Sequence, residues 1–178
     1  MDKIHWLHLS DIHLNKRDVD SRRMRNRLLD YVKELGTQID YIFITGDLRY
    51  APMGEFAADT VDYINKLLNV TNLTVDRLFI VPGNHDIERD AEGRAEAILE
   101  SIKDYSPKDG ALASDKMAAV HCGHTEFRKM MHTIYHENQE QAASYDDDEK
   151  PHFVTETKDF NIICIDTALT YTKQRNNN

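Results

Sequence analysis

The hydrophobic pattern of the first half of the chain alternates short apolar runs with longer amphipathic stretches. The runs at 4–9, 41–45 and 78–81 predict three strands, of which 41–45, with its β-branched and aromatic residues, is interpreted as buried. Between them, apolar residues recur at helical spacing at about 20–35 and 54–68, which predicts two helices. The buried stripe expected on the first helix consists of Met24, Leu28, Tyr31, Val32 and Leu35. This order of elements is typical of a largely parallel sheet covered by helices.

The pattern changes after the third predicted strand. Apolar density falls between about 88 and 150, and we interpret this stretch as a helical insertion within a single domain that spans 1–178. Its best-defined helix is expected at about 117–136. The buried side of that helix is expected to carry Val120, Phe127, Met131 and Ile134.

The remainder of the chain gives weaker signals. The run YDDDEK at 145–150 has the composition of an exposed loop. Strand character returns at 153–154 and at 160–165. The polar ending at 173–178 carries no packing signal and is expected to be a frayed tail.

Length and cysteine content narrow the class of protein. With 178 residues the chain is long enough for one domain, and it has no run approaching the roughly 18–20 apolar residues that a membrane span needs. Its N-terminus, MDKIHWLHLSDIHL, lacks the apolar region of a signal peptide, and Cys122 and Cys164 lack CxxC partners. We therefore expect a cytoplasmic protein with two idle thiols and no membrane partner.

The charge balance of the chain is acidic, with a formal net charge of −9 at pH 7. An acidic surface repels nucleic-acid backbones, so extensive binding of DNA or RNA is not expected. A local basic cluster opens with Lys16 and Arg17 and continues with Arg22, Arg23, Arg25 and Arg27. Because these arginines spread around a helix, we interpret them as a solvated helix face rather than as a phosphate-binding surface.

Three polar clusters follow the three predicted strands directly. They are SDIH at 10–13, TGD at 45–47 and PGNHD at 82–86. Right-handed crossovers bring the carboxyl ends of parallel strands to one edge of a sheet, and open α/β sheets bind ligands at that edge. Each cluster supplies carboxylate, imidazole or amide groups, so their placement predicts a metal site there.

Four side chains in these clusters are candidate metal ligands. Alternate residues of an extended segment point the same way, so Asp11 and His13 can bind one ion together. Asp47 follows a glycine that lets the backbone approach closely and can bridge two cations, while Asn84 offers a neutral oxygen to the second. Mixed oxygen and imidazole ligands favour divalent Mn, Fe or Zn. Two such ions about 3.5–4 Å apart can clamp a phosphoryl oxygen and turn a bridging water into hydroxide.

The third cluster also supplies two candidate catalytic groups. His85 is free to protonate a leaving alkoxide. Asp86 is expected to hold and charge the imidazole of His85 from behind. Asp-x-His and Gly-Asp are weak signals alone, but all three clusters in order, each directly after an apolar strand, favour a functional site.

The clusters bear a family resemblance. Asp11-x-His13, Gly46-Asp47 and Gly83-Asn84-His85-Asp86 resemble the first three signature motifs of the calcineurin-like metallophosphoesterase superfamily. The resemblance covers 1–90 and returns at 162–167, where the family usually has a strand that closes with a polar turn. It implies an α/β fold of two packed mixed β-sheets flanked by helices, incomplete here at the C-terminus. It also implies that Asp11 and His13 bind the first metal, Asp47 bridges, Asn84 binds the second, and His85 is the general acid.

The chain departs from the family pattern in two places. The family usually carries Asp or Asn three residues after the bridging aspartate, where this chain has Tyr50, a difference that bears on substrate placement more than on metal binding. The family completes its metal shell with later histidines, including a Gly-His-x-His motif, for which this chain offers the near miss GHTE at 123–126. We interpret the sequence as a fragment of a longer chain, with a degenerate domain as the alternative.

Two functions from different classes fit these features. The leading hypothesis is a metal-dependent phosphoesterase that hydrolyses phosphomonoester or phosphodiester substrates. The alternative is a catalytically incomplete module of the same fold that binds other proteins through the helical insertion. A nuclease of the same superfamily is a narrower option, against which the acidic charge argues.

Overall fold

The protein's structure, a computed structural model, describes residues 3–14, 16, 18–50, 58–89, 91–104, 114–147 and 151–171, with the backbone alone at 101–104 and 114–116. Its centre is a parallel sheet of three strands in the order β1-β2-β3. The strands are β1 (Trp6–Leu9), β2 (Tyr41–Thr45) and β3 (Leu78–Val81). The predicted bounds of β2 and β3 are confirmed, and β1 begins at Trp6 rather than at residue 4.

Two helices connect these strands, as the sequence predicts. They are α1 (Val19–Glu34) and α2 (Ala58–Thr71), and a 3₁₀ turn, η1 (Val75–Arg77), leads into β3. The hydroxyl and the backbone N–H of Ser21 donate to the Asp18 carboxylate over 2.7 and 2.8 Å, which caps the first turn of α1 and lowers the pKa of Asp18. Residues 51–57, which include the predicted start of the second helix, lie outside the described residues.

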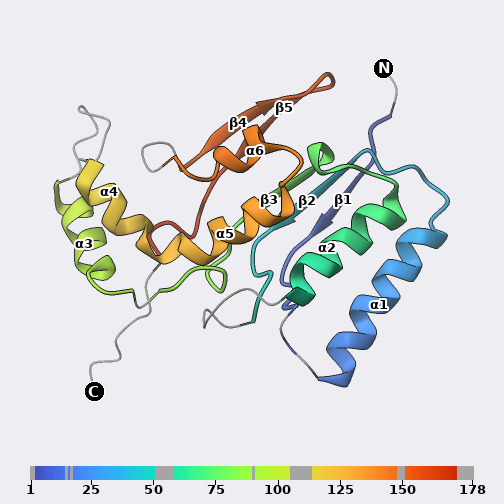
Figure 1. Cartoon of the computed structure of the whole chain (residues 1–178), viewed down its shortest axis with the longest axis horizontal. Helices are drawn as coiled ribbons and strands as arrows, with labels where there is room; N and C mark the ends of the chain where they lie inside the picture. The colour runs from blue at the N-terminus through green and yellow to red at the C-terminus, as the bar shows by residue number, and fades with distance from the viewer. Residues whose placement is uncertain are drawn as a thin grey trace.

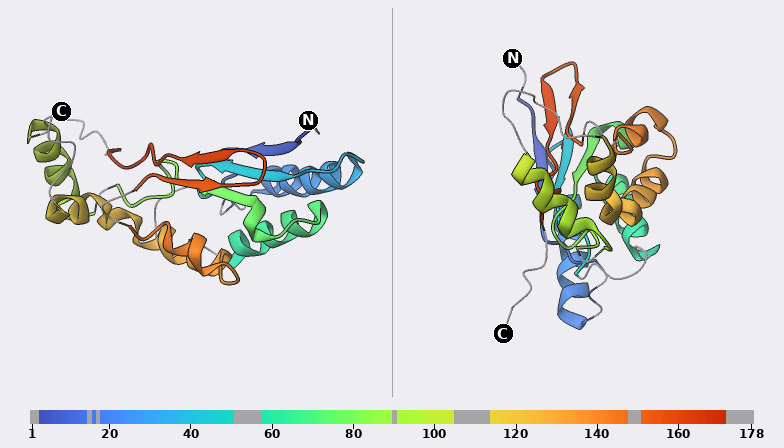
Figure 2. Two further views of the ribbon diagram at one scale, coloured as in Figure 1. Left: turned by 90° about the horizontal axis from the view of Figure 1, so that it is seen from above. Right: turned by 90° about the vertical axis from the view of Figure 1, so that its left-hand side faces the viewer.

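The sheet is covered differently on its two faces (Figure 1). Ile42 and Ile44 of β2 lie in the larger core with residues of α2 and of a later helix, α5 (Thr125–Ile134). Tyr41 of β2 faces the opposite way and packs with β5 (Asn161–Cys164), because successive side chains of a strand alternate between faces. The result is a layer of helices, a parallel sheet and a second small sheet, which Figure 2 shows from the side.

The second sheet is a pair of antiparallel strands, β4 (Phe153–Glu156) and β5. Ile162 and Cys164 of β5 are buried against the first sheet. The fold is therefore α/β, with two packed sheets flanked by helices, as predicted. Within the described residues neither sheet mixes directions, because one is parallel and the other antiparallel.

The buried side of α1 differs from the predicted stripe. Met24 and Tyr31 are 57% and 62% exposed, and the buried positions are Arg25 and Val32. The Arg25 guanidinium donates to the backbone carbonyls of His13 (3.2 Å) and Lys16 (3.0 Å). A buried cation is tolerated here because backbone oxygens satisfy it. Arg25 is thus not part of a solvated face.

The region interpreted as a helical insertion contains helices, with one correction. Its elements are α3 (Arg94–Asp104), α4 (Ser114–His121), the 3₁₀ turn η2 (Cys122–His124), α5 and α6 (Gln139–Ala143). The single helix predicted at 117–136 is wrong, because η2 breaks it. A Cβ on Gly123 would lie 2.4 Å from the Glu88 carbonyl oxygen, so glycine permits the close approach at this break. The predicted buried positions of the helix are all buried.

The acidic stretch at 145–150 is not wholly an exposed loop. The Tyr145 hydroxyl donates to the Ile80 carbonyl oxygen over 2.8 Å, and its ring packs against the larger core. Burial raises the pKa of Tyr145. Residues 148–150, like the tail at 172–178, lie outside the described residues. The aromatic ring overrides the polar composition of its neighbours.

Two expectations from composition can be compared with the structure. None of the described helices is both long enough and apolar enough to cross a lipid bilayer. Cys122 and Cys164 are free thiols, as predicted, and burial raises the pKa of Cys164 to about 11. Cys164 is therefore a protonated core residue at neutral pH.

Candidate metal centre

The three predicted clusters lie at one edge of the parallel sheet, just past the ends of its strands. The loops after β1 and β2 run side by side because the amides of Asp11, His13 and Leu14 donate to the carbonyl oxygens of Gly46 (3.2 Å), Asp47 (3.1 Å) and Leu48 (2.6 Å). These hydrogen bonds extend the pairing of β1 with β2 beyond the strands themselves. The backbone at the site is therefore fixed by the sheet.

The structure brings together three of the four predicted metal ligands. Asp11, His13 and Asp47 each offer a donor atom, and these atoms lie within 4.8 Å of one another. The expected reason for their convergence is wrong, because Asp11 and His13 are not extended. Their φ angles are 55° and 50°, and that of Asp47 is 55°. Residues in this region store about 1–3 kcal/mol each and cluster at functional sites.

The tautomer of His13 suits metal binding. Its Nδ1 lies 3.1 Å from the Arg49 carbonyl oxygen. Because a carbonyl oxygen can only accept, Nδ1 donates the proton and the lone pair of Nε2 is left free to bind a cation. A second interaction that orients a metal-binding imidazole in this way is usual in metal sites.

Two glycines let the backbone pack around Asp47. A Cβ on Gly46 would lie 2.6 Å from the Cα of Gly83, and Gly46 has a φ of 95°. A Cβ on Gly83 would lie 2.2 Å from Oδ1 of Asp47. Only glycine fits at these positions without moving the backbone of Gly83 or the carboxylate of Asp47. The motif glycines therefore place Asp47 between the two loops.

Asn84 lies beside this group, in a cavity of about 590 Å³. The cavity is lined by Asp11, Asp47 and Asn84. It is also lined by residues of β5 and of the loop that follows, including Thr167 and Tyr171. The position of Asn84 is compatible with a ligand to a second ion, and that role stays a prediction.

His85 lies next to the three candidate metal ligands, and one of them, Asp47, holds the backbone of His85. The His85 amide donates to Oδ1 of Asp47 over 3.0 Å. Its ring stacks on Tyr50 and meets His13 edge-on. Nδ1 of the ring is buried and has no hydrogen-bond partner among the described residues, which leaves Nε2 as the nitrogen that can exchange a proton with a ligand.

Asp86 has a different role from the predicted one. Its carboxylate accepts the backbone amides of Gly83 (2.9 Å) and Arg49 (3.0 Å), so it does not hold Nδ1 of the His85 ring. The side chain is fully buried, and burial raises the pKa of Asp86 while these amides oppose the rise. Asp86 therefore fixes the Gly-Asn-His-Asp turn.

Arg49 is a supporting residue that the sequence reasoning missed. It is 2% exposed, and its guanidinium donates to the carbonyl oxygens of His85 and Asp86, each over 2.9 Å. Burial lowers the pKa of Arg49, and the negative charge of Asp86 opposes that effect. Its only sequence signal was its position two residues after Asp47.

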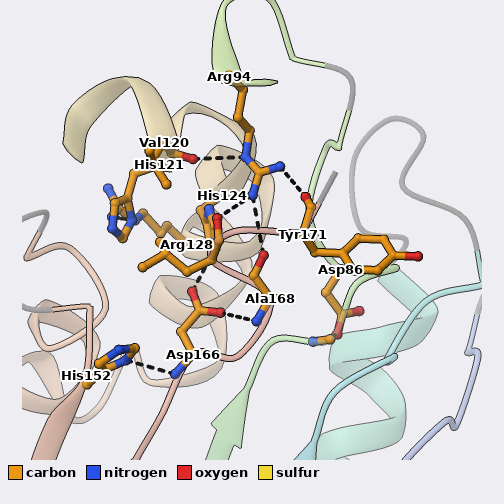
Figure 3. Close-up of polar contacts among 12 residues, drawn as sticks. Asp86, Arg94, Val120, His121, His124, Arg128, His152, Asp166, Ala168 and Tyr171 are labelled. Carbon is orange, nitrogen blue, oxygen red and sulfur yellow. Dashed lines mark hydrogen bonds and ion pairs between the residues drawn. The ribbon is translucent and has the colours of Figure 1, made fainter. Parts of the chain in front are cut away.

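A buried arginine holds the loop after β5, whose residues Ala168 and Tyr171 line the cavity (Figure 3). The side chain of Arg94, at the start of α3, is fully buried. It donates to the backbone carbonyls of Val120 (2.9 Å), Ala168 (3.4 Å), Leu169 (2.7 Å) and Tyr171 (2.6 Å). The loop after β5 is thus attached to the helical region.

A histidine–aspartate pair holds the beginning of the same loop. Nε2 of His124 donates to Asp166 over 2.8 Å, and both side chains are buried. The other oxygen of Asp166 accepts the amide of Ala168, and the Asp166 amide donates to Nδ1 of His152. The polar turn predicted after the last strand is confirmed. Asp166 in this turn pairs with His124, the histidine of the GHTE sequence at 123–126.

Comparison with known proteins agrees with this geometry. A sequence model of the calcineurin-like phosphoesterase family matches residues 4–163, which is most of the chain. The chain belongs to this family. As a calcineurin-like phosphoesterase it is similar to the uncharacterized metallophosphoesterase-like protein YydB of Bacillus subtilis (strain 168), with 27% identity over 170 residues.

That match covers 94% of the chain but 34% of YydB, so the chain spans about a third of the length of this curated relative. No solved structure matches the chain significantly. Family membership makes a metal-dependent site the expected one. The donor set fits such a site, because two carboxylates and an imidazole with a free Nε2 converge at the family's motif positions.

Proposed function

We propose that this calcineurin-like phosphoesterase hydrolyses phosphomonoester or phosphodiester bonds with the help of two divalent ions of Mn, Fe or Zn. The observation that carries the proposal is the convergence of the donor atoms of Asp11, His13 and Asp47 within 4.8 Å at the strand ends. Asp11, His13, Asp47 and Asn84 are the residues that would hold these ions. The ions supply Lewis-acid stabilisation of the phosphoryl oxygens and activation of water.

The residues of the chain have distinct tasks in this reaction. Gly46 and Gly83 allow Asp47 to approach both loops, and the Arg49 carbonyl keeps the Nε2 lone pair of His13 available. His85 is the general acid: as the bond from phosphorus to the leaving oxygen breaks, a proton passes from Nε2 to that oxygen. Water adds to phosphorus and releases its proton to solvent, from which His85 is reprotonated.

The substrate binds in the cavity of about 590 Å³ that Asp11, Asp47 and Asn84 line. The acidic net charge disfavours a nucleic-acid substrate bound through its backbone. We further propose a cytoplasmic location, on the basis of the free thiols.

The test compares Asp47→Asn with a matched control, Asp30→Asn, which changes an exposed carboxylate on α1. Calorimetric titration with Mn²⁺ and hydrolysis of 4-nitrophenyl phosphate and its bis ester are measured for each protein. Asp47→Asn is expected to weaken Mn²⁺ binding by more than about tenfold and to reduce hydrolysis, while the control does neither.

Two results would count against the proposal. Wild-type protein that cleaves neither ester with Mn²⁺, together with no effect of Asp47→Asn, would remove the enzymatic interpretation. Fewer than one bound ion per chain in a folded protein would instead favour the alternative, a module of the same fold used for protein interaction.

A further inference from the structure

Three aromatic rings form a cluster beside the candidate metal centre. Tyr50 stacks on His85 with ring centroids 6.1 Å apart and an interplanar angle of 8°. His13 meets both rings edge-on, at 5.5 Å from Tyr50 and 5.6 Å from His85. Offset stacking and edge-to-face contacts are the favoured geometries of such rings. Tyr50 therefore touches both a metal-binding and a proton-donating side chain.

The His85 ring has little other support. Its main chain is fixed, because the amide donates to Asp47 and the carbonyl accepts from Arg49. These bonds do not determine the rotation of the side chain. Nδ1 has no hydrogen-bond partner among the described residues, and the Asp86 carboxylate accepts backbone amides instead. The orientation of the ring thus depends on the packing around it.

Tyr50 is itself held in place although it is half exposed. The Lys16 ammonium lies 5.4 Å from the centroid of its ring, a cation–π arrangement. Tyr50 belongs to neither of the hydrophobic cores. The described contacts of its ring with His13, His85 and Lys16 all lie at the site.

We propose that Tyr50 is a positioning residue that orients the imidazole of His85 for proton donation, in place of a hydrogen-bond partner. This inference rests on the proposed function, in which His85 is the general acid. The stacked ring limits the rotation of the imidazole and keeps Nε2 directed at the leaving oxygen. The tyrosine at this position is thus a functional substitution for the Asp or Asn usual in the family.

The kinetic test uses two leaving groups that differ in their need for a proton. 4-Nitrophenolate departs readily as an anion, whereas phenolate, whose conjugate acid has a pKa of about 10 as in tyrosine, benefits from protonation. Tyr50→Ala is expected to lower kcat for phenyl phosphate about tenfold more than kcat for 4-nitrophenyl phosphate, with little change in KM. Tyr50→Phe is expected to restore the ratio, because the ring and not the hydroxyl makes the contact.

The matched control is Tyr31→Ala, which removes a similarly exposed tyrosine from α1 and leaves the ratio of the two kcat values unchanged. Bound Mn²⁺ is measured in every variant, so that a loss of metal is not mistaken for a misplaced acid. Equal losses of kcat for the two esters in Tyr50→Ala, or a change in KM alone, would overturn the proposal.

A second measurement does not depend on activity. In metal-free protein, nuclear Overhauser contacts are expected between the ring protons of Tyr50 and His85, with His85→Gln used to assign the histidine signals. Tyr50→Phe keeps these contacts and Tyr50→Ala shifts the remaining His85 signals. Absence of the contacts overturns the proposal even if the enzyme is active. Wild-type protein inactive on both esters instead refutes the proposed function, and the role of Tyr50 falls with it.

Discussion

Gly46→Ala is the change that most directly tests how the sheet edge is built. An alanine Cβ at this position would lie 2.6 Å from the Cα of Gly83 and 2.7 Å from its nitrogen. Carbon atoms in contact prefer about 3.5–4.0 Å, so the two loops must separate by about 1 Å. Overpacking of this kind costs about 1–3 kcal/mol.

The backbone at Gly46 adds a second penalty. Its φ of 95° is unfavourable for alanine, by about 1–2 kcal/mol. The expected loss in the free energy of unfolding is therefore about 2–5 kcal/mol. Gly93→Ala separates the two effects, because Gly93 has a φ of 74° but no heavy atom within 4 Å of an added Cβ. This control should lose about 1–2 kcal/mol.

The assay is urea denaturation of the metal-free proteins, monitored by far-ultraviolet circular dichroism. The same m value, the dependence of the free energy of unfolding on urea concentration, is used for all variants. The structure predicts that Gly46→Ala is less stable than Gly93→Ala by about 1–3 kcal/mol. Equal losses in the two variants would mean that the approach of Gly46 to Gly83 does not limit the packing of the two loops. The close-approach argument for this edge would then be wrong.

Three further changes test other parts of the fold. Arg94→Met should lower the free energy of unfolding by about 3–5 kcal/mol, because it leaves buried carbonyls unpaired. In the same urea assay, Arg27→Met, which replaces an exposed arginine, should change it by less than about 0.5 kcal/mol. Burial raises the pKa of Tyr63 to about 12. The folded state therefore keeps a proton that the unfolded chain loses near pH 10. The free energy of unfolding should fall by about 3 kcal/mol as pH rises from 10 to 12. Tyr63→Phe should remove that part of the alkaline loss, and Tyr31→Phe should not. Asp18→Ala should cost about 1 kcal/mol by removing the cap of α1, measured by thermal unfolding.

The strands and the motifs were predictable because their signals are local. Short runs of β-branched and aromatic residues marked β2 and β3 without error, and the residues after them had to meet at one edge of a parallel sheet. The convergence of Asp11, His13 and Asp47 follows from that rule. Its detailed geometry does not, because the left-handed backbone is imposed by hydrogen bonds between the two loops.

The errors concern side chains whose hydrogen-bond partners are backbone groups. Arg25 belongs to a basic cluster in the sequence, but its guanidinium is buried because two carbonyls of the preceding loop accept its protons. Asp86 follows His85 directly, and adjacency suggested a contact with its ring. The backbone amides of Gly83 and Arg49 donate to the carboxylate of Asp86 instead. The spacing of apolar and polar residues does not reveal such pairs.

The left-handed conformation of Asp11, His13 and Asp47 has a consequence for protein engineering. Glycine would occupy these dihedral angles with less strain, so the native residues hold the apo chain below the stability it could reach. Substitutions chosen for thermal tolerance would accumulate at these positions and erase the donor set. At these three positions the chain thus trades conformational stability for ion binding, because the residues that can bind an ion are less stable in this backbone conformation than glycine.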